Sequence, residues 1–361
     1  MVQLESLRTL LEIRDLRVSF QTNGETVRAV DGVSLRIPAG KTVALVGESG
    51  CGKSATALSV LRLLPQPPAG IDGQLLFTDP RSDWPVDLLR LPVRELRHVR
   101  GNRIAMIFQE PMSSLNPVIT IGRQIAEVLE HHRRVGLRAA WSRAVELLDM
   151  VGIPAPRERA YEYPHRLSGG MLQRVMIAMA LACEPCVLIA DEPTTALDVT
   201  VQQQILELLQ SAQVRSGMSV LLITHDLGVV AQLADEVYVM YAGTIVEHAP
   251  ASRLLQSPLH PYTQGLLAAT PRITESRGRL VAIPGVVPAP PNLPTGCRFH
   301  PRCSLSPERA RQPGRFVVKA ASEFGGFVLH RCVEQIDAEE SGPPPLREAR
   351  PGHFVACWEA K

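Results

Sequence analysis

The fold of this chain is decided by the stretch Gly47-Glu48-Ser49-Gly50-Cys51-Gly52-Lys53-Ser54. Residues 42–46 before it are apolar and predict a buried strand, and residues 53–64 after it predict a helix that ends at prolines. The glycines let successive backbone N–H groups face one anion, and the helix start adds the positive end of its dipole. Because this is the phosphate-loop pattern between strand and helix, we expect residues 47–55, from Gly47 to Ala55, to bind nucleotide phosphates. Lys53 is expected to neutralise the β- and γ-phosphates, and Ser54 to ligate Mg²⁺.

A second candidate site element is the apolar run Val187–Ala190, which ends in Asp191 and Glu192. Ligands of open α/β sheets bind at the carboxyl ends of strands, where these acids lie. Asp191 is expected to hold Mg²⁺, which prefers hard oxygen ligands. Glu192 is then placed to orient and deprotonate the attacking water. The alternative is that both acids are merely solvated.

Composition limits the class of protein. The chain has 361 residues, 38 Lys+Arg against 36 Asp+Glu, and a formal net charge of +2, a near-balance that argues against a nucleic-acid binder. No apolar run reaches the roughly 18 residues of a membrane-spanning helix, and the first residues do not resemble a signal peptide. We therefore expect a cytosolic protein whose membrane contact comes through partners.

The order of elements predicts an α/β fold with a mainly parallel sheet, because strand patterns alternate with helical ones. Strands are expected at 103–108, 187–190, 220–224 and 237–241, and helices at 119–134, 141–151 and 171–183. Strands at 11–20 and 29–37 suggest an antiparallel addition at the N-terminus. The stretch 283–294 is rich in proline and reads as a linker, so a domain boundary is expected within residues 250–283.

The stretch Leu167-Ser168-Gly169-Gly170-Met171 resembles the signature motif of the ATP-binding cassette (ABC) ATPases. In the order of that family, Gln109, the segment Ala196-Leu197-Asp198 and His225 resemble the Q-loop, D-loop and switch histidine. The resemblance covers about residues 8–250. It implies a P-loop NTPase cassette at 8–258 with a helical subdomain at about 112–170, followed by a small Cys/Pro-rich domain at 259–361.

The resemblance also implies roles for single residues. Ser168, Gly169 and Gly170 begin a helix and are expected to complete the ATP site of a partner subunit, so that ATP lies between two cassettes. Gln109 would sense Mg²⁺ and the attacking water, and His225 would contact the γ-phosphate. Asp198 is expected at the nucleotide site. Phe20 is the candidate to stack on adenine, with a core strand aromatic as the alternative.

One branch of the family is favoured. Met171 stands where most ABC ATPases have Gln, and this Met is usual in the oligopeptide/dipeptide importers. The segments 109–117, 189–198 and 260–267 are similar to the same branch. It implies a heterodimer with a second ATPase subunit, two permease subunits, an extracytoplasmic binding protein and a peripheral place on the cytoplasmic face of the membrane. Nickel chelates, glutathione or peptide antibiotics are alternative substrates. Export, and a soluble ABC ATPase in DNA repair or on ribosomes, are remoter alternatives.

The last part of the chain carries four of the seven cysteines, Cys297, Cys303, Cys332 and Cys357. Residues 296–303 and 355–358 resemble the C-terminal motif of that branch, which implies a [4Fe–4S] cluster. The third cysteine normally follows the second closely, so residues 304–329 are interpreted as enclosing an insertion. Four thiolates are the ligand count of such a cluster, but zinc and free thiols stay open. The Cys183-x-x-Cys186 pair is interpreted as structural, and Cys51 as a small loop residue.

Overall fold

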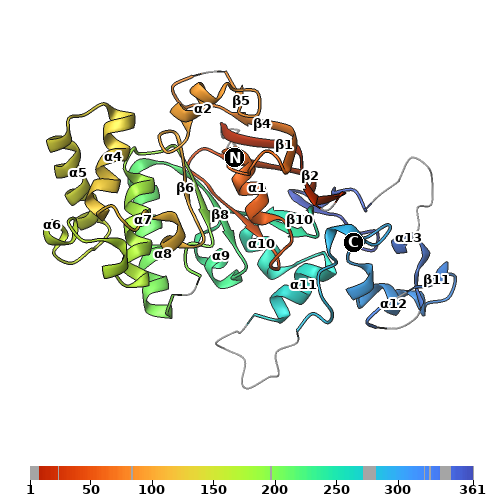
Figure 1. The fold of residues 1–361 in the computed structure, drawn as a ribbon. Coiled ribbons are helices and arrows are strands. Elements are labelled where there is room, and N and C mark those ends of the chain that lie inside the picture. The colour runs from red at the N-terminus through yellow and green to blue at the C-terminus, as the bar shows by residue number, and fades with distance from the viewer. Residues whose placement is uncertain are drawn as a thin grey trace, which may run out of the picture.

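The computed structural model describes residues 8–22, 24–82, 84–195, 197–270, 282–320, 322–324, 327–333 and 343–360. Within these ranges the chain forms an eight-stranded mixed sheet and a four-stranded antiparallel sheet, with helices around them (Figure 1). The strand order is β13-β14-β10-β9-β3-β8-β7-β6 in the larger sheet and β2-β1-β4-β5 in the smaller one. The predicted α/β class with an antiparallel N-terminal addition is confirmed.

Five neighbouring strands of the larger sheet run parallel to one another. They are β3 (Thr42–Val46), β6 (Ile104–Ile107), β7 (Val187–Asp191), β8 (Ser219–Thr224) and β9 (Glu236–Tyr241). Almost every residue of these strands is buried, as expected for a parallel sheet covered on both faces. Because the strands run in the same direction, the loops after β3, β6, β7 and β8 leave the sheet at one edge.

The smaller sheet holds the N-terminal strands. It comprises β1 (Thr9–Thr22), β2 (Glu25–Pro38), β4 (Ala69–Phe77) and β5 (Val86–Asp87), and α2 (Val93–Val99) follows it. Alternate residues of β1 and β2 point into a buried cluster shared with α1 and one face of the larger sheet. Sequence periodicity identified β1 and β2 but not β4, whose burial alternates less regularly.

Helices cover the larger sheet and extend beyond one end of it. Around the sheet lie α1 (Lys53–Val60), α7 (Gly169–Leu181), α8 (Val199–Ser216), α9 (Leu227–Leu233), α10 (Ala251–Gln256) and α11 (Pro261–Ala268). At one end of the molecule lie α4 (Ile121–Arg133), α5 (Leu137–Met150) and α6 (Pro156–Arg159) (Figure 1). The short helices α3 (Pro111–Ser114) and η1 (Pro164–Arg166) precede and follow them in the chain. The first helix was predicted to reach residue 64 and this was wrong: α1 ends at Val60, because Arg62 adopts a left-handed φ of 50°.

The C-terminal elements lie at the end opposite α4–α6 (Figure 1). They are η2 (Pro290–Asn292), η3 (His300–Arg302), α12 (Leu305–Ala310), β11 (Val317–Lys319), β12 (Phe327–Leu329), α13 (His330–Val333), β13 (Arg347–Arg350) and β14 (His353–Val355). Strand β14 pairs antiparallel with β10 (Thr244–Pro250), so the tail returns to extend the core sheet. The domain limits at 258/259 stay a prediction, and residues 271–281 of the expected boundary lie outside the described residues.

A buried contact between a glutamate and a histidine joins this tail to the sheet. The carboxylate of Glu247 on β10 and the ring of His353 on β14 are both fully buried, with 2.7 Å between Oε1 and Nε2. The same carboxylate accepts hydrogen bonds from the backbone N–H groups of Leu259 (2.7 Å) and His260 (3.0 Å). Since a buried carboxylate is costly unless it is hydrogen-bonded, these partners fix where the chain after α10 meets β14.

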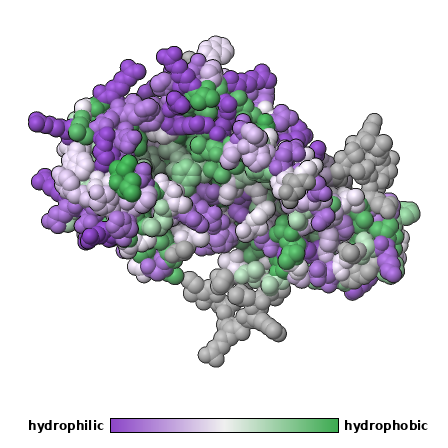
Figure 2. Space-filling model, viewed as in Figure 1, coloured by the Kyte–Doolittle hydropathy of each residue, from purple (hydrophilic) through white to green (hydrophobic). Residues whose placement is uncertain are grey.

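Figure 2 shows hydrophobic residues on the surface over the C-terminal elements, where Phe316 is 87% exposed and Phe327 61% exposed. Polar residues cover most of the same face over α4–α6 and the smaller sheet (Figure 2). In the described part of the chain, no helix combines the length and the apolar character that crossing a bilayer requires.

Candidate ATP site

The phosphate loop connects β3 to α1 and is folded around its own lysine. The Lys53 side chain is buried, and its Nζ donates hydrogen bonds to the carbonyl oxygens of Gly47 (2.7 Å) and Glu48 (2.9 Å). Gly52 has a φ of 109°, and a Cβ there would lie 2.5 Å from the carbonyl oxygen of Ala29. Only glycine fits this position, so the backbone stays bare where phosphates are expected to approach.

Ser54 and Asp191, two of the three side chains expected at the magnesium site with Gln109, lie side by side. The hydroxyl of Ser54, in the first turn of α1, donates to Oδ1 of Asp191 at the end of β7 over 3.2 Å. Burial raises the pKa of Asp191, against the opposing effects of the Ser54 hydrogen bond and the Lys53 charge. A hydroxyl and a carboxylate at this distance are hard oxygen donors of the kind that Mg²⁺ takes alongside phosphate oxygens and water.

The carboxylate of Glu192 is held by three side chains from three loops. Its Oε2 accepts from Gln109 Nε2 (3.2 Å) and from Thr195 Oγ1 (2.8 Å), and its Oε1 lies 3.2 Å from Nδ1 of His225. Glu192 has a left-handed φ of 47°, an uncommon conformation for a residue with a side chain, and its N–H donates to the carbonyl of Ile223. Strain of this kind clusters at functional sites, where the surroundings enforce it.

The arrangement around Glu192 follows from the parallel sheet. Gln109 follows β6, Glu192 follows β7 and His225 follows β8, and these strands are neighbours in the sheet. The sequence identified all three of these side chains as candidates. It did not identify Thr195, whose hydroxyl returns to the carboxylate three residues earlier in the turn after β7. A carboxylate fixed by such donors beside a phosphate site can accept a proton from an attacking water.

The signature residues lie at the start of α7. Ser168 is the N-cap, and its Oγ accepts from the N–H of Met171 at 3.4 Å. Ser168 and Gly169 are exposed to solvent, so the N-terminal end of this long helix is open. Asp198 likewise caps α8, because its Oδ1 accepts from the N–H of Val201 at 3.0 Å. Of the expected D-loop, Ala196 lies outside the described residues.

The adenine candidate lies on β1. Phe20 pairs with Val27 of β2 and Ala69 of β4, and its ring packs partly buried against the cluster beneath α1. It is therefore in contact with core residues while retaining some exposed surface. Stacking of this ring on adenine stays a prediction.

The four tail cysteines line one small cavity. Cys297, Cys303, Cys332 and Cys357 surround a volume of about 20 Å³, close to what a single water requires. None forms a disulfide. Burial raises the pKa of all four thiols, to about 12 for Cys303, so they are neutral in the absence of a ligand.

These thiols fit a sulfur-ligated metal group by their chemistry but not by their present spacing. Within the described ranges, no three His, Cys, Asp or Glu side chains lie where they could hold one metal ion. The iron–sulfur cluster therefore stays a prediction. Cys183 and Cys186 carry raised pKa values, also chiefly through burial, as expected of structural residues.

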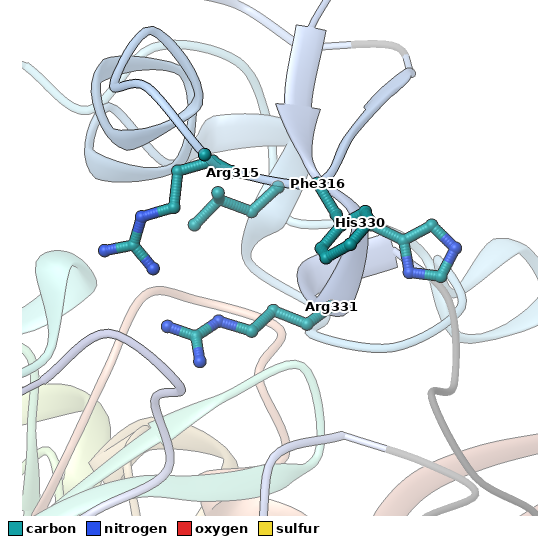
Figure 3. A pocket seen from close by; sticks show the side chains of 6 residues that line it. Arg315, Phe316, His330 and Arg331 are labelled. Atoms are coloured by element: carbon teal, nitrogen blue, oxygen red, sulfur yellow. The ribbon is translucent and has the colours of Figure 1, made fainter.

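A larger cavity of about 430 Å³ lies in the C-terminal segment, away from the phosphate loop. Figure 3 shows Arg315 and Arg331 extending to the same side of it, and both guanidinium groups pair with the carboxylate of Glu359. The ring of Phe316 lines the same cavity, and none of these residues belongs to the loops that form the ATP site. The two arginines thus serve an ion pair within the tail.

A phosphate loop, an acid beside it at the end of β7 and a glutamate held by three side chains, all on a mainly parallel sheet, are the features of an ATP-hydrolysing P-loop protein. Two family descriptions match the chain: "ABC transporter" over residues 30–195 and "Oligopeptide/dipeptide transporter, C-terminal region" over residues 246–309. The oligopeptide transport ATP-binding protein AppD of Bacillus subtilis is 49% identical over 338 residues, covering 93% of this chain and all of AppD. A Brucella melitensis protein named as a peptide import ATP-binding protein is 53% identical over 309 residues, which cover 84% of this chain and 91% of the relative.

Solved structures agree. The dimeric ATP-binding cassette MJ0796, bound to ADP and Pi, superimposes with a TM-score of 0.59 at 26% identity over 67% of this chain and 99% of that one. CbiO1 of Clostridium perfringens, part of an ABC transporter complex, gives a TM-score of 0.56 at 26% identity over 69% of this chain and 91% of that one. The chain belongs to the ATP-binding subunits of ABC transporters, in the oligopeptide/dipeptide branch, and the family resemblance seen in the sequence is confirmed.

Proposed function

We propose that this chain hydrolyses ATP to drive import of peptides, paired with a second ATPase subunit on a permease of two membrane subunits. The observation that carries the proposal is the Glu192 carboxylate held by Gln109, Thr195 and His225 beside the phosphate loop. Lys53 would bind the phosphates, and Ser54 and Asp191, whose side chains are hydrogen-bonded to each other, would hold Mg²⁺ when it binds. Glu192 takes the proton of the attacking water, which Gln109 and His225 help to orient.

The pairing with a second ATPase follows from the open start of α7. A helix N-terminus with exposed serine and glycine N–H groups binds anions, and this one is exposed to solvent. We infer that Ser168, Gly169 and Gly170 contact the γ-phosphate of ATP on the partner, while the partner does the same for this chain. The start of α8, capped by Asp198, is close to the start of α7, because a Cβ at Gly170 would meet Val201. Support comes from the similar cassette MJ0796, whose solved structure is described as dimeric.

Peptides are the favoured cargo because the relatives are named for peptide import and oligopeptide transport. Nickel chelates, glutathione and peptide antibiotics stay alternatives, since a binding protein outside the cell and the permease select the substrate. We infer that the chain itself works on the cytoplasmic face of the membrane. Uptake of labelled peptides by vesicles carrying the assembled transporter tests this, with the Glu192→Gln assembly as the control. The proposal would be overturned if the Glu192→Gln assembly took up peptides as fast as the wild type. Co-purification of the chain with ribosomes instead of permease subunits would also overturn it.

We also propose that Cys297, Cys303, Cys332 and Cys357 bind a [4Fe–4S] cluster. Support comes from their convergence on one cavity, from the absence of disulfides among them and from the branch resemblance. When bound, such a group would supply four metal–sulfur bonds, which would cross-link and stabilise a short, proline-rich segment. Iron and acid-labile sulfide in anaerobically purified protein, lost in Cys297→Ser, are the expected result. Zinc in place of iron would refute the iron–sulfur cluster. Protein that contains no metal would also refute it and would show that the four cysteines are free thiols.

A further inference from the structure

A buried arginine of the cysteine-bearing tail reaches the phosphate loop. Arg302, on η3, is only 3% exposed. Its guanidinium forms two hydrogen bonds with the carboxylate of Glu48, at 2.7 and 2.9 Å, and its Nε donates to the carbonyl of Pro284 at 2.8 Å. Two-point pairing of arginine with a carboxylate fixes geometry as well as charge. Glu48 is the second residue of the loop, so the tail holds the loop near its start.

A second contact fixes the backbone of the same residue. The N–H of Glu48 donates to the hydroxyl of Tyr262 on α11 at 2.8 Å. Tyr262 is fully buried and packs in a tilted arrangement against Tyr241 and Phe299, with ring centroids 4.6 and 5.4 Å away. Because both its amide and its carboxylate are bound to elements beyond residue 258, Glu48 cannot reorient without disturbing them.

The position of Glu48 in turn sets that of the phosphate-binding lysine. The carbonyl oxygen of Glu48 accepts one of the hydrogen bonds from Lys53 Nζ. A chain of direct contacts therefore runs from Arg302 through Glu48 to Lys53. A side chain that is already held in place, as Lys53 is here, loses less freedom when phosphate binds, which favours binding.

The arginine shares a tight turn with two of the cysteines. Within residues 297–303 the backbone is closed by hydrogen bonds from His300 to Cys297 and from Cys303 to His300, at 3.0 and 3.2 Å. Arg302 directly precedes Cys303. The conformation of this turn, and hence the reach of the arginine, depends on how the thiols are held.

We propose that Arg302 is a positioning residue for the phosphate loop, through which the cysteine-bearing tail raises the affinity for ATP. The proposal rests on the proposed function only in that the loop binds ATP. Arg302 lies too far along the contact chain to touch the reacting atoms. Its removal is therefore expected to change nucleotide affinity and KM, and to leave kcat at saturating ATP nearly unchanged.

Binding of MgATP to the full chain by calorimetry, and kcat and KM of the assembled transporter, test this. Arg302→Gln and Glu48→Gln are each expected to weaken binding about tenfold, as for loss of a charge-assisted hydrogen bond. The double variant is expected to match either single one, and Arg302→Lys to recover part of the loss. Arg315→Gln, which removes a tail arginine paired with Glu359, is the matched control and should bind ATP normally.

Unchanged ATP affinity in Arg302→Gln, or additive losses in the double variant, would overturn the proposal. If Arg302→Gln fails to fold, Glu48→Gln decides alone, since it leaves the arginine in place and breaks the same contact. Cys303→Ser is expected to weaken ATP binding by the wild-type chain. It should cause no further loss in Glu48→Gln, because the turn acts on the loop through the contact of Arg302 with Glu48. A wild-type chain that binds no ATP would instead refute the proposed function itself.

Discussion

Replacing Glu192 by glutamine changes the group that we propose accepts the proton of the attacking water. Glutamine has nearly the same shape as glutamate, and the side chain of Glu192 is only 11% exposed. The substitution should therefore preserve the fold and the loop after β7. An amide cannot take the proton of water, and its NH₂ group meets donors from Gln109 and Thr195 where the carboxylate accepted them. Loss of a general base slows hydrolysis by about 10²–10⁴-fold. That range corresponds to roughly 2.7–5.5 kcal/mol of activation free energy.

The assay is phosphate release by the assembled transporter at saturating MgATP, together with nucleotide binding by the full chain. We expect Glu192→Gln to bind ATP at least as tightly as the wild type while its turnover falls by the stated range. Glu207→Gln, an exposed glutamate on α8, is the matched control and should hydrolyse ATP normally. Turnover of Glu192→Gln at the wild-type rate would refute the assignment of the base.

Three further predictions concern other parts of the chain. Lys53→Ala should weaken ATP binding by about 10- to 100-fold in calorimetry, as expected for lost hydrogen bonds to a charged group; an unchanged affinity would contradict the phosphate-loop assignment. Ser168→Ala removes the cap of α7 and about 1 kcal/mol of helix stability, and it should lower hydrolysis in the assembly while ATP binding by the isolated chain stays normal. Asp79→Asn should lower the free energy of unfolding at pH 7 by about 1 kcal/mol, because Arg103 pairs with Asp79 through two hydrogen bonds, of 2.6 and 2.7 Å. Burial raises the pKa of Asp79, but the Arg103 and Arg81 interactions outweigh it and the net pKa is lowered. The stabilisation is therefore present above about pH 3.9 and is lost as the pH falls through the lower pKa of the folded state. Urea titrations at several pH values should show this loss in the wild type and not in Asp79→Asn.

The elements that the sequence predicted are those whose pattern is local. The phosphate loop, the two acids after β7 and the capped start of α7 are each written in a few adjacent residues, because backbone turns and helix caps depend on near neighbours. The strands of the parallel core were found for the same reason, since burial on both faces makes them continuous apolar runs.

What the sequence did not reveal depends on contacts between distant segments. Glu48 and Arg302 are 254 residues apart, and neither side chain differs in type from a solvated surface residue. Strands β13 and β14 are short, and β13 (Arg-Glu-Ala-Arg) has no strand-like apolar alternation, so its place in the sheet follows only from pairing with β14. Thr195 lies in a motif that was recognised, but its hydroxyl could be assigned to Glu192 only once the turn after β7 was seen.

The claim that this chain contributes half of a shared ATP site is tested most directly by nucleotide trapping with its second ATPase subunit. The Glu192→Gln variant of this chain and the second subunit are mixed with MgATP. The mass of the resulting species and the nucleotide bound to it are measured by sedimentation. We expect one complex containing both subunits with ATP retained, and no complex when Ser168→Arg blocks the start of α7. The account would be contradicted if this chain alone, as a monomer, retained ATP equally well. It would also be contradicted if the complex formed without nucleotide and if Ser168→Arg did not prevent it.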